Sequence, residues 1–143
     1  MPKNRGGMIT MTRSLNILVL DDHIEVAESL GEILELERHT VTLVHDGLSA
    51  VQAFREHNFD LGFFDIKMPG LNGVESFLEI KKDRPSARVI MMSGFADDEL
   101  ISKALDNGAL ALLRKPFDVD ELLAKLSDAA NICTTEPSAA ASH

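Results

Sequence analysis

Five short apolar runs, each followed by a segment with helical periodicity, constrain the fold of this chain more than any other feature. The runs have the length of β-strands and are bounded by polar or turn-forming residues; they cover residues 15–20, 40–44, 60–64, 88–92 and 109–114. Five strand–helix units with short connections predict right-handed crossovers and a parallel sheet that helices cover on both faces. The predicted fold class is therefore a doubly wound α/β sandwich.

The periodicity after each run predicts which side chains face the sheet. We expect five inward stripes, one for each helix: Val26, Ala27, Leu30, Ile33 and Leu34; Leu48, Val51, Ala53 and Phe54; Val74, Phe77, Leu78 and Ile80; Leu100, Ile101, Ala104 and Leu105; Val119, Leu122, Leu123 and Leu126. Turn-forming residues agree with these helices. Gly70, Asn72 and Gly73 predict a turn before the third helix. Asn107-Gly108 predicts the end of the fourth helix, and Asp118 an N-cap for the fifth.

The segments outside this alternation predict two short tails around a single domain. Residues 1–14 carry three basic side chains and no acidic one, and are interpreted as a flexible arm. Residues 132–143 are small and polar, and are interpreted as a flexible tail. The domain is thus expected over residues 15–131, and we expect no output domain in this sequence.

Composition excludes several classes of function. The chain has 143 residues and a net charge of −9, which disfavours direct binding to nucleic acid or to an anionic membrane. No apolar run approaches the roughly 20 residues of a membrane span, and the N-terminus lacks a secretory signal, so we expect a cytoplasmic protein. The single Cys133 cannot form an intramolecular disulfide or a cysteine-based zinc site.

Polar side chains stand where four of the five apolar runs end. Asp21 and Asp22 follow the first run, Asp65 the third, Ser93 the fourth and Lys115 the fifth. Because parallel strands place their carboxyl ends at one edge of a sheet, these side chains are predicted to converge on one pocket. Crowded carboxylates repel one another, and a divalent cation with oxygen ligands removes that cost. The sequence therefore predicts a Mg²⁺ site, with Mn²⁺ as an alternative ion.

The chemistry of these residues favours phosphoryl transfer. Asp65 follows two phenylalanines and can attack a phosphoryl group as a carboxylate nucleophile. Lys115 can pair with a phosphoryl oxygen, and the Ser93 hydroxyl can donate a hydrogen bond to another. Taken singly, each residue has a simpler interpretation: Asp21 and Asp22 as a helix N-cap, Asp65 and Ser93 as turn residues, and Lys115 as the partner of an aspartate in a salt bridge.

At these residues the chain resembles the receiver domains of two-component response regulators. The resemblance covers about residues 15–130 and rests on the segments ILVLDD, FFDIKMPGLNG, VIMMSG and LLRKPF. It implies a flavodoxin-like sheet with strand order 2-1-3-4-5. It also implies that Asp65 is the phosphorylated aspartate, that Ser93 is the switch hydroxyl and that Lys115 contacts the phosphoryl group.

The same resemblance implies a set of magnesium ligands and partner proteins. Asp22 and Asp65 match direct Mg²⁺ ligands, Asp21 acts through water, and the backbone carbonyl of Lys67 is a third protein ligand. The phosphoryl donor is a phosphohistidine on a sensor histidine kinase or a histidine phosphotransfer protein. The output is a separate protein or a self-dimer, reached through the face of the fourth helix, fifth strand and fifth helix.

One residue departs from the family pattern, and two others occupy variable positions. Leu112 stands where receivers commonly have Tyr or Phe as the inward-turning ring of the switch. Lys67 and Phe95 lie at positions that, in the family, line the route of the hydrolytic water. We therefore expect both to influence the lifetime of the phosphorylated form. His23 follows the acidic pair. We interpret it as a solvent-facing helix residue, with a place on the rim of the pocket as the alternative.

Two alternative functions are compatible with parts of the sequence. A phosphorylation-independent docking module is one, although such modules usually lose one or more of the residues that are intact here. A Mg²⁺-dependent phosphatase resembling the haloacid dehalogenases is the other. That class needs a second aspartate two residues after its nucleophile, and this position holds Lys67. Motifs of nucleotide phosphate loops, dinucleotide-binding folds, serine hydrolases and HExxH zinc enzymes are absent from the sequence.

Overall fold

The computed structural model describes residues 14–94 and 98–135, and these form an alternation of strands and helices. The strands are β1 (Asn16–Leu20), β2 (Thr40–Val44), β3 (Leu61–Asp65), β4 (Val89–Ser93) and β5 (Ala111–Arg114). The helices are α2 (Ile24–Leu36), α3 (Gly47–Glu56), α4 (Gly73–Asp83), α5 (Asp98–Asp106) and α6 (Val119–Thr135). Each strand lies within two residues of the apolar run that predicted it.

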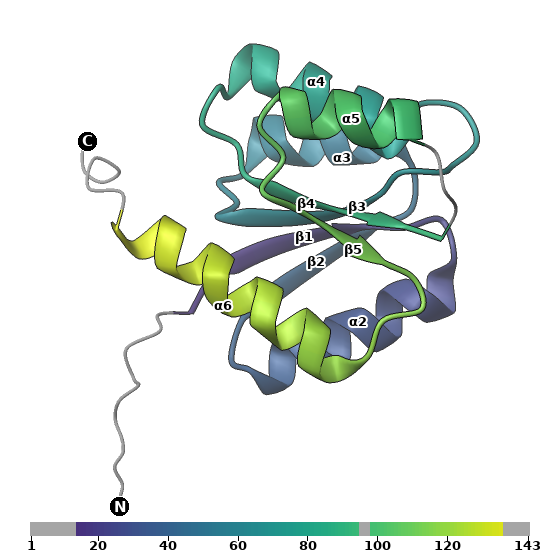
Figure 1. Ribbon diagram of the computed structural model, residues 1–143. Coiled ribbons are helices and arrows are strands. Elements are labelled where there is room, and N and C mark those ends of the chain that lie inside the picture. Colours follow the sequence, from purple (N-terminus) through teal and green to yellow (C-terminus); the bar gives the residue numbers. More distant parts are fainter. Residues whose placement is uncertain (1–13, 95–97, 136–143) are drawn as a thin grey trace, which may run out of the picture.

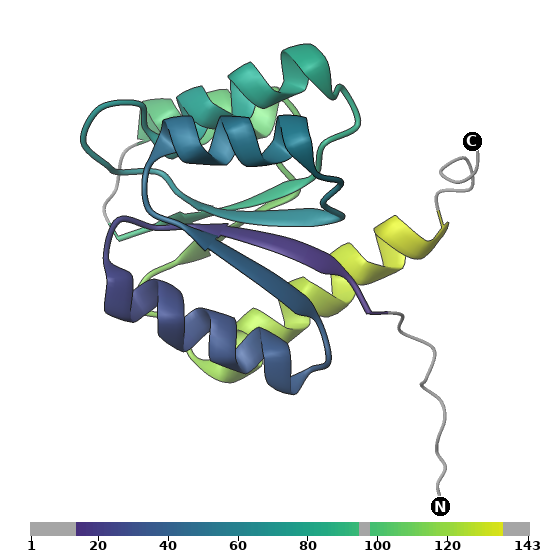
Figure 2. The same ribbon diagram turned by 180° about the vertical axis from the view of Figure 1, so that it is seen from behind.

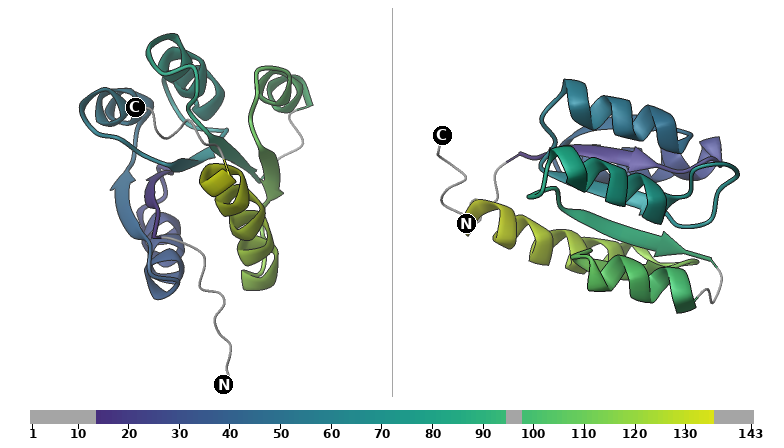
Figure 3. Two further views of the ribbon diagram at one scale, coloured as in Figure 1. Left: turned by 90° about the vertical axis from the view of Figure 1, so that its left-hand side faces the viewer. Right: turned by 90° about the horizontal axis from the view of Figure 1, so that it is seen from above.

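The sheet is parallel throughout, with strand order β2-β1-β3-β4-β5. Helices α3, α4 and α5 cover one face, and α2 and α6 cover the other (Figures 1 and 2). The view nearly along the strands in Figure 3, left, shows these three layers. The predicted fold class and strand order are confirmed. None of the helices in the described residues is long and apolar enough to cross a membrane.

The two-residue period of the strands divides the core into two halves. In β1, Ile17 and Val19 pack with residues of α2 and α6, whereas Leu18 and Leu20 pack with residues of α3, α4 and α5. Every one of these four side chains is fully buried. Because both faces of β1, β3 and β4 are covered, these strands read as continuous apolar runs in the sequence. The core thereby fixes the carboxyl ends of the central strands in space.

Four apolar residues predicted to face the sheet are instead at helix margins; their relative exposures are 39% for Val26, 72% for Leu48, 44% for Leu105 and 47% for Val119. Helix α3 gives a physical reason for one of these errors. Its inward position at the first turn belongs to Gly47, because a Cβ atom there would collide with Ser76 and with the backbone of Leu71. Leu48 is therefore turned outward.

The turn and capping predictions agree with the structure. Asn72 and Glu75 form a reciprocal capping box at the start of α4, and Asp118 accepts a hydrogen bond of 2.8 Å from the Glu121 N–H at the start of α6. Gly108 has φ +101°, as a helix-ending glycine does. Helix α6 continues to Thr135, so the predicted domain end at residue 131 falls inside this helix.

Candidate functional site

The carboxyl ends of the strands bring the predicted residues to one edge of the sheet, which we call the carboxyl edge. Asp21 directly follows β1, Asp65 ends β3 and Ser93 ends β4. Lys115 directly follows β5, and its backbone N–H donates a 2.7 Å hydrogen bond to the carbonyl of Ser93. Residues separated by up to 94 positions in the chain therefore meet at this edge.

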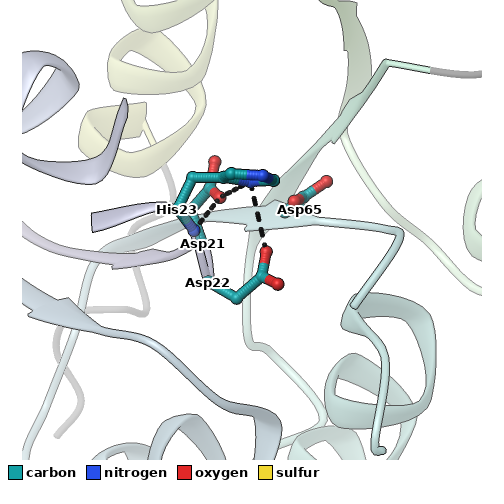
Figure 4. Close-up of side chains that lie close together, drawn as sticks. All are labelled: Asp21, Asp22, His23 and Asp65. Carbon is teal, nitrogen blue, oxygen red and sulfur yellow. Dashed lines mark hydrogen bonds and ion pairs between the residues drawn. The ribbon is translucent and has the colours of Figure 1, made fainter. Parts of the chain in front are cut away.

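Four side chains at this edge, Asp21, Asp22, His23 and Asp65, form a cluster that we call the acidic pocket. One ligand atom from each of the four lies within 4.8 Å of the others. Asp21 is fully buried and Asp65 is 4% exposed, whereas the Asp22 side chain is 30% exposed. Figure 4 shows the four side chains gathered at the ends of β1 and β3. The cluster is thus buried at its base and open on one side.

Lys115 supplies a positive charge next to this cluster. Its Nζ lies 2.7 Å from Asp21 Oδ2 and 3.5 Å from Asp65 Oδ2. The Lys115 side chain is 20% exposed and that of Asp21 is fully buried, so this ion pair is poorly screened by solvent. The salt bridge considered from the sequence is therefore present, with Asp21 as the nearer partner of Lys115 and Asp65 as the more distant one. One lysine balances only one of three nearby carboxylates.

The electrostatics of Asp65 reflect this imbalance. Burial raises the pKa of Asp65 from its ordinary value of 3.8 to about 6. Lys115 opposes that rise, while the negative charges of Asp21 and Asp22 add to it. A carboxyl group with these neighbours holds its proton more firmly than a solvated one. Asp65 would become a carboxylate at neutral pH more easily with a further positive charge beside it.

The oxygen atoms of the pocket fit a divalent cation. Within the described residues, Oδ1 of Asp22 is buried and has no hydrogen-bond partner. A buried carboxylate oxygen without a partner is costly, and a metal ion removes that cost. Three carboxylates against one lysine leave two negative charges to balance. Hard oxygen donors and this charge are what Mg²⁺ prefers, so the pocket fits that ion.

The loop between β1 and α2 holds Asp21 by several bonds but leaves Asp22 open. Asp21 Oδ1 accepts a 2.9 Å hydrogen bond from the His23 N–H, and the Asp21 N–H donates to the Val44 carbonyl at 3.2 Å. His23 itself is the N-cap residue of α2, and its side chain makes no capping hydrogen bond. Neither aspartate is the N-cap of α2, in contrast to the alternative interpretation of this pair.

The loop between β3 and α4 fixes the backbone of Asp65. The Gly73 N–H donates to the Ile66 carbonyl at 3.2 Å, and Gly73 packs so closely on Asp65 that a Cβ atom would collide with the Asp65 carbonyl. The Lys67 N–H lies 3.4 Å from Asp65 Oδ1, a long hydrogen bond. Only glycine therefore fits at position 73 without moving the strand that ends in Asp65.

Of the remaining predicted residues, the structure describes Ser93, Lys67 and Leu112. Ser93 is 3% exposed at the end of β4, and Lys67 is exposed just after Asp65. Leu112 is partly buried in β5 and packs with the half of the core under α3, α4 and α5. Phe95 falls outside the described residues.

Sequence reasoning underestimated His23. Its side chain is 71% exposed, as predicted for a solvent-facing residue, yet Nδ1 lies 3.4 Å from Oδ1 of Asp21 and 3.4 Å from Oδ1 of Asp22. Its position directly after the acidic pair was the available signal. The five histidines of the sequence are not spaced as a metal-binding set. For that reason the sequence analysis did not consider His23 together with the neighbouring aspartates.

A groove of about 690 Å³ opens beside Lys115, between α2 and the segment that joins β5 to α6. Val26, Leu30 and Ile33 line it from α2. Pro116 and Phe117 line it from the opposite side. An apolar surface thus adjoins the charged residues of the carboxyl edge.

The comparisons with known proteins agree with this geometry. The family model described as "Response regulator receiver domain" matches residues 17–127. The chain is 38% identical over 115 residues to the transcriptional regulatory protein ZraR of Klebsiella oxytoca, a match that covers 80% of this chain and 26% of ZraR. The chain therefore spans about a quarter of the length of that relative.

A shorter relative and a solved structure match over nearly their whole lengths. Sporulation initiation phosphotransferase F of Bacillus subtilis is 31% identical over 106 residues, with 74% of this chain and 86% of that protein covered. The crystal structure of a response regulator receiver domain protein (CheY-like) from Methanospirillum hungatei JF-1 has a TM-score of 0.82 and 30% identity. That match covers 87% of this chain and 99% of the solved chain.

Proposed function

Because this chain belongs to the family of response regulator receiver domains, we propose that Asp65 accepts a phosphoryl group from a phosphohistidine on a donor protein. The observation that carries the proposal is the position of Asp65, which is 4% exposed and has Lys115 Nζ 3.5 Å from its Oδ2. A buried carboxylate with a fixed backbone and an adjacent cation is suited to attack on phosphorus. The chain then acts as a signalling phosphoacceptor.

The transfer forms one bond and breaks one. A carboxylate oxygen of Asp65 bonds to phosphorus as the phosphorus–nitrogen bond to the donor imidazole breaks, and the imidazole leaves with the bonding electron pair. Lys115 and the Ser93 hydroxyl contact phosphoryl oxygens. In the free protein Lys115 is held by Asp21 at 2.7 Å, so contact with a phosphoryl oxygen would compete with this ion pair.

A magnesium ion would be held by Asp22, Asp65 and the backbone carbonyl of Lys67, with Asp21 acting through water. When bound, Mg²⁺ supplies positive charge that offsets both the carboxylates and the phosphoryl oxygens. Asp22 is suited to this role because its buried Oδ1 has no hydrogen-bond partner in the described part of the chain. Mn²⁺ has the same ligand preferences and would substitute.

The donor and the output partner are proposed to use different surfaces. We assign the donor, a sensor histidine kinase or a histidine phosphotransfer protein, to the apolar groove beside Lys115. We assign the output to the face of α5, β5 and α6, through a separate protein or a second copy of this chain. Leu105 on α5 is 44% exposed and is available for such contact.

Three side chains are proposed to set the duration and the readout of the signal. Lys67 is exposed beside Asp65 and influences access of hydrolytic water, and we assign the same role to Phe95. Leu112 takes the place of the usual aromatic switch residue, so the readout here depends less on a ring that turns inward.

Labelling with a small phosphoryl donor tests the proposal. The purified chain is incubated with acetyl phosphate and Mg²⁺, and its intact mass is measured. We expect a single added phosphoryl group in the natural sequence and in Asp128→Asn, a control on the exposed side of α6. Asp65→Asn and removal of Mg²⁺ by chelation should abolish the addition.

Three results would contradict the proposal. Labelling that persists in Asp65→Asn would show that another residue is the phosphoacceptor. Absence of labelling in the natural sequence would favour the docking module. Repeated turnover of varied phosphoesters would favour the phosphatase.

A further inference from the structure

The imidazole of His23 has no structural function that the fold requires. It belongs to the N-cap residue of α2, yet it makes no capping hydrogen bond. Its side chain is 71% exposed, and Nδ1 lies 3.4 Å from each of two carboxylate oxygens, beyond the length of a good hydrogen bond. In Figure 4 dashed lines join the His23 ring to the carboxylates of Asp21 and Asp22. The fold would be complete without it.

The ring nitrogen does fit one use, which is metal binding. One ligand atom each from His23, Asp21, Asp22 and Asp65 lies within 4.8 Å of the others. Two ligands of one small divalent ion, each at about 2.1 Å, are separated by at most roughly 4.2 Å. The widest pair of these atoms must therefore come closer by at least about 0.6 Å. The exposed His23 side chain can rotate to adjust its own position.

We propose that His23 is a nitrogen ligand that extends the ion selectivity of the acidic pocket from Mg²⁺ to Ni²⁺, Co²⁺ and Zn²⁺. Carboxylates and carbonyls suit Mg²⁺ and Mn²⁺, whereas imidazole favours the later transition metals. A pocket built only of oxygen ligands lacks this additional preference. The inference rests on the proposed function, because it assumes that the acidic pocket is the magnesium site.

Competition between the two kinds of ion follows from their shared ligands. Asp22 and Asp65 are assigned to Mg²⁺, and they belong to the same four-residue cluster as His23. An ion held partly by His23 excludes Mg²⁺ from these carboxylates. Phosphoryl acceptance by Asp65 is then inhibited by low concentrations of Ni²⁺ or Zn²⁺ in the presence of Mg²⁺.

Calorimetric titration of the metal-free, tag-free chain tests the proposal. Ni²⁺ and Mg²⁺ are titrated separately into the natural sequence, His23→Gln, and His57→Gln as a matched control on an exposed histidine outside the pocket. We expect His23→Gln to weaken Ni²⁺ binding by about tenfold or more and to leave Mg²⁺ binding unchanged. His57→Gln should change neither, and Asp22→Asn should weaken both.

An independent readout comes from the imidazole nitrogens themselves. Zn²⁺ titration should shift the ¹⁵N resonance of a ring nitrogen of His23 in long-range ¹H–¹⁵N spectra and leave that of His57 in place. Equal Ni²⁺ affinity in the natural sequence and His23→Gln, with no shift at His23, would overturn this inference. That result leaves Mg²⁺ binding and Asp65 labelling intact, whereas loss of those two would overturn the proposed function itself.

Discussion

Two loops at the carboxyl edge use their polar groups in opposite ways. In the loop from β3 to α4, the Asn72 side chain accepts from the Glu75 N–H at 2.8 Å, and the Glu75 carboxylate accepts from the Asn72 N–H at 3.0 Å. In the loop from β1 to α2, the His23 side chain makes no capping hydrogen bond, and within the described residues Asp22 Oδ1 accepts no hydrogen bond. The first loop fixes the position of Asp65, and the second leaves a buried carboxylate oxygen without a hydrogen bond.

The largest effect is expected from Gly73→Ala, at the first residue of α4, where the loop that follows Asp65 ends. The added Cβ atom would collide with the Asp65 carbonyl, which is backbone and cannot rotate away. We expect a loss of about 3 kcal/mol in the free energy of unfolding, together with weaker phosphorylation of Asp65. Urea unfolding followed by circular dichroism measures the first quantity.

Gly70→Ala is the matched control in the same loop. Gly70 has φ +70° but no atom within 4 Å of an added Cβ, so only the backbone conformation is penalised. We expect the free energy of unfolding to fall by about 1 kcal/mol and phosphorylation of Asp65 to be retained. Equal losses from the two substitutions would show that contact with Asp65 is not what position 73 requires.

Asp65→Asn should stabilise the metal-free protein at neutral pH. Because the pKa of Asp65 is raised to about 6 in the folded state, the folded protein retains a proton that the unfolded chain loses above pH 3.8. Stability contributed by this group is thus full below about pH 4 and is lost as pH rises through 6. An asparagine at position 65 does not titrate, so the variant does not lose this stability as pH rises. We expect its free energy of unfolding to exceed that of the natural sequence by on the order of 2 kcal/mol at pH 7.5 and to differ little at pH 4.

The measurement is thermal or urea unfolding in chelator at both pH values. Added Mg²⁺ should stabilise the natural sequence more than Asp65→Asn, because the ion needs the carboxylate. A destabilised Asp65→Asn at pH 7.5 would show that the ion pair with Lys115 outweighs the cost of burying the charge.

The smallest effects are expected from substitution of the N-cap residues of α4 and α2, which we compare directly. Asn72→Ala removes the capping box of α4 and should lower the free energy of unfolding by about 1 kcal/mol. His23→Ala removes a side chain that caps nothing and should change it by less than about 0.5 kcal/mol without metal. Paired urea titrations in chelator measure the difference. A larger loss from His23→Ala would mean that its imidazole supports the fold rather than an ion.

The fold was predictable because its determinants are local. Continuous apolar runs marked the strands, and the alternation of strands and helices predicted parallel crossovers. The strand order came only from the resemblance to receiver domains. The helix faces were less predictable at their first turns. Gly47, and not Leu48, faces inward at the first turn of α3, because this position contacts Leu71 and Ser76. These two residues come from a distant part of the chain. A periodic pattern contains no information about such neighbours.

The gathering of aspartates and Lys115 was likewise predictable, but their pairing was not. Lys115 Nζ lies 2.7 Å from Asp21 and 3.5 Å from Asp65, so Asp21 is the nearer of its two partners. Differences of less than 1 Å decide these partners, and sequence spacing does not resolve them.

The backbone bond from Lys115 to Ser93 has a mechanical consequence. At 2.7 Å, it ties the residue that follows β5 to the last residue of β4. We expect a displacement of the Ser93 backbone to displace Lys115 as well, and with it the short segment that leads into α6. The ends of two separate strands are coupled by this bond.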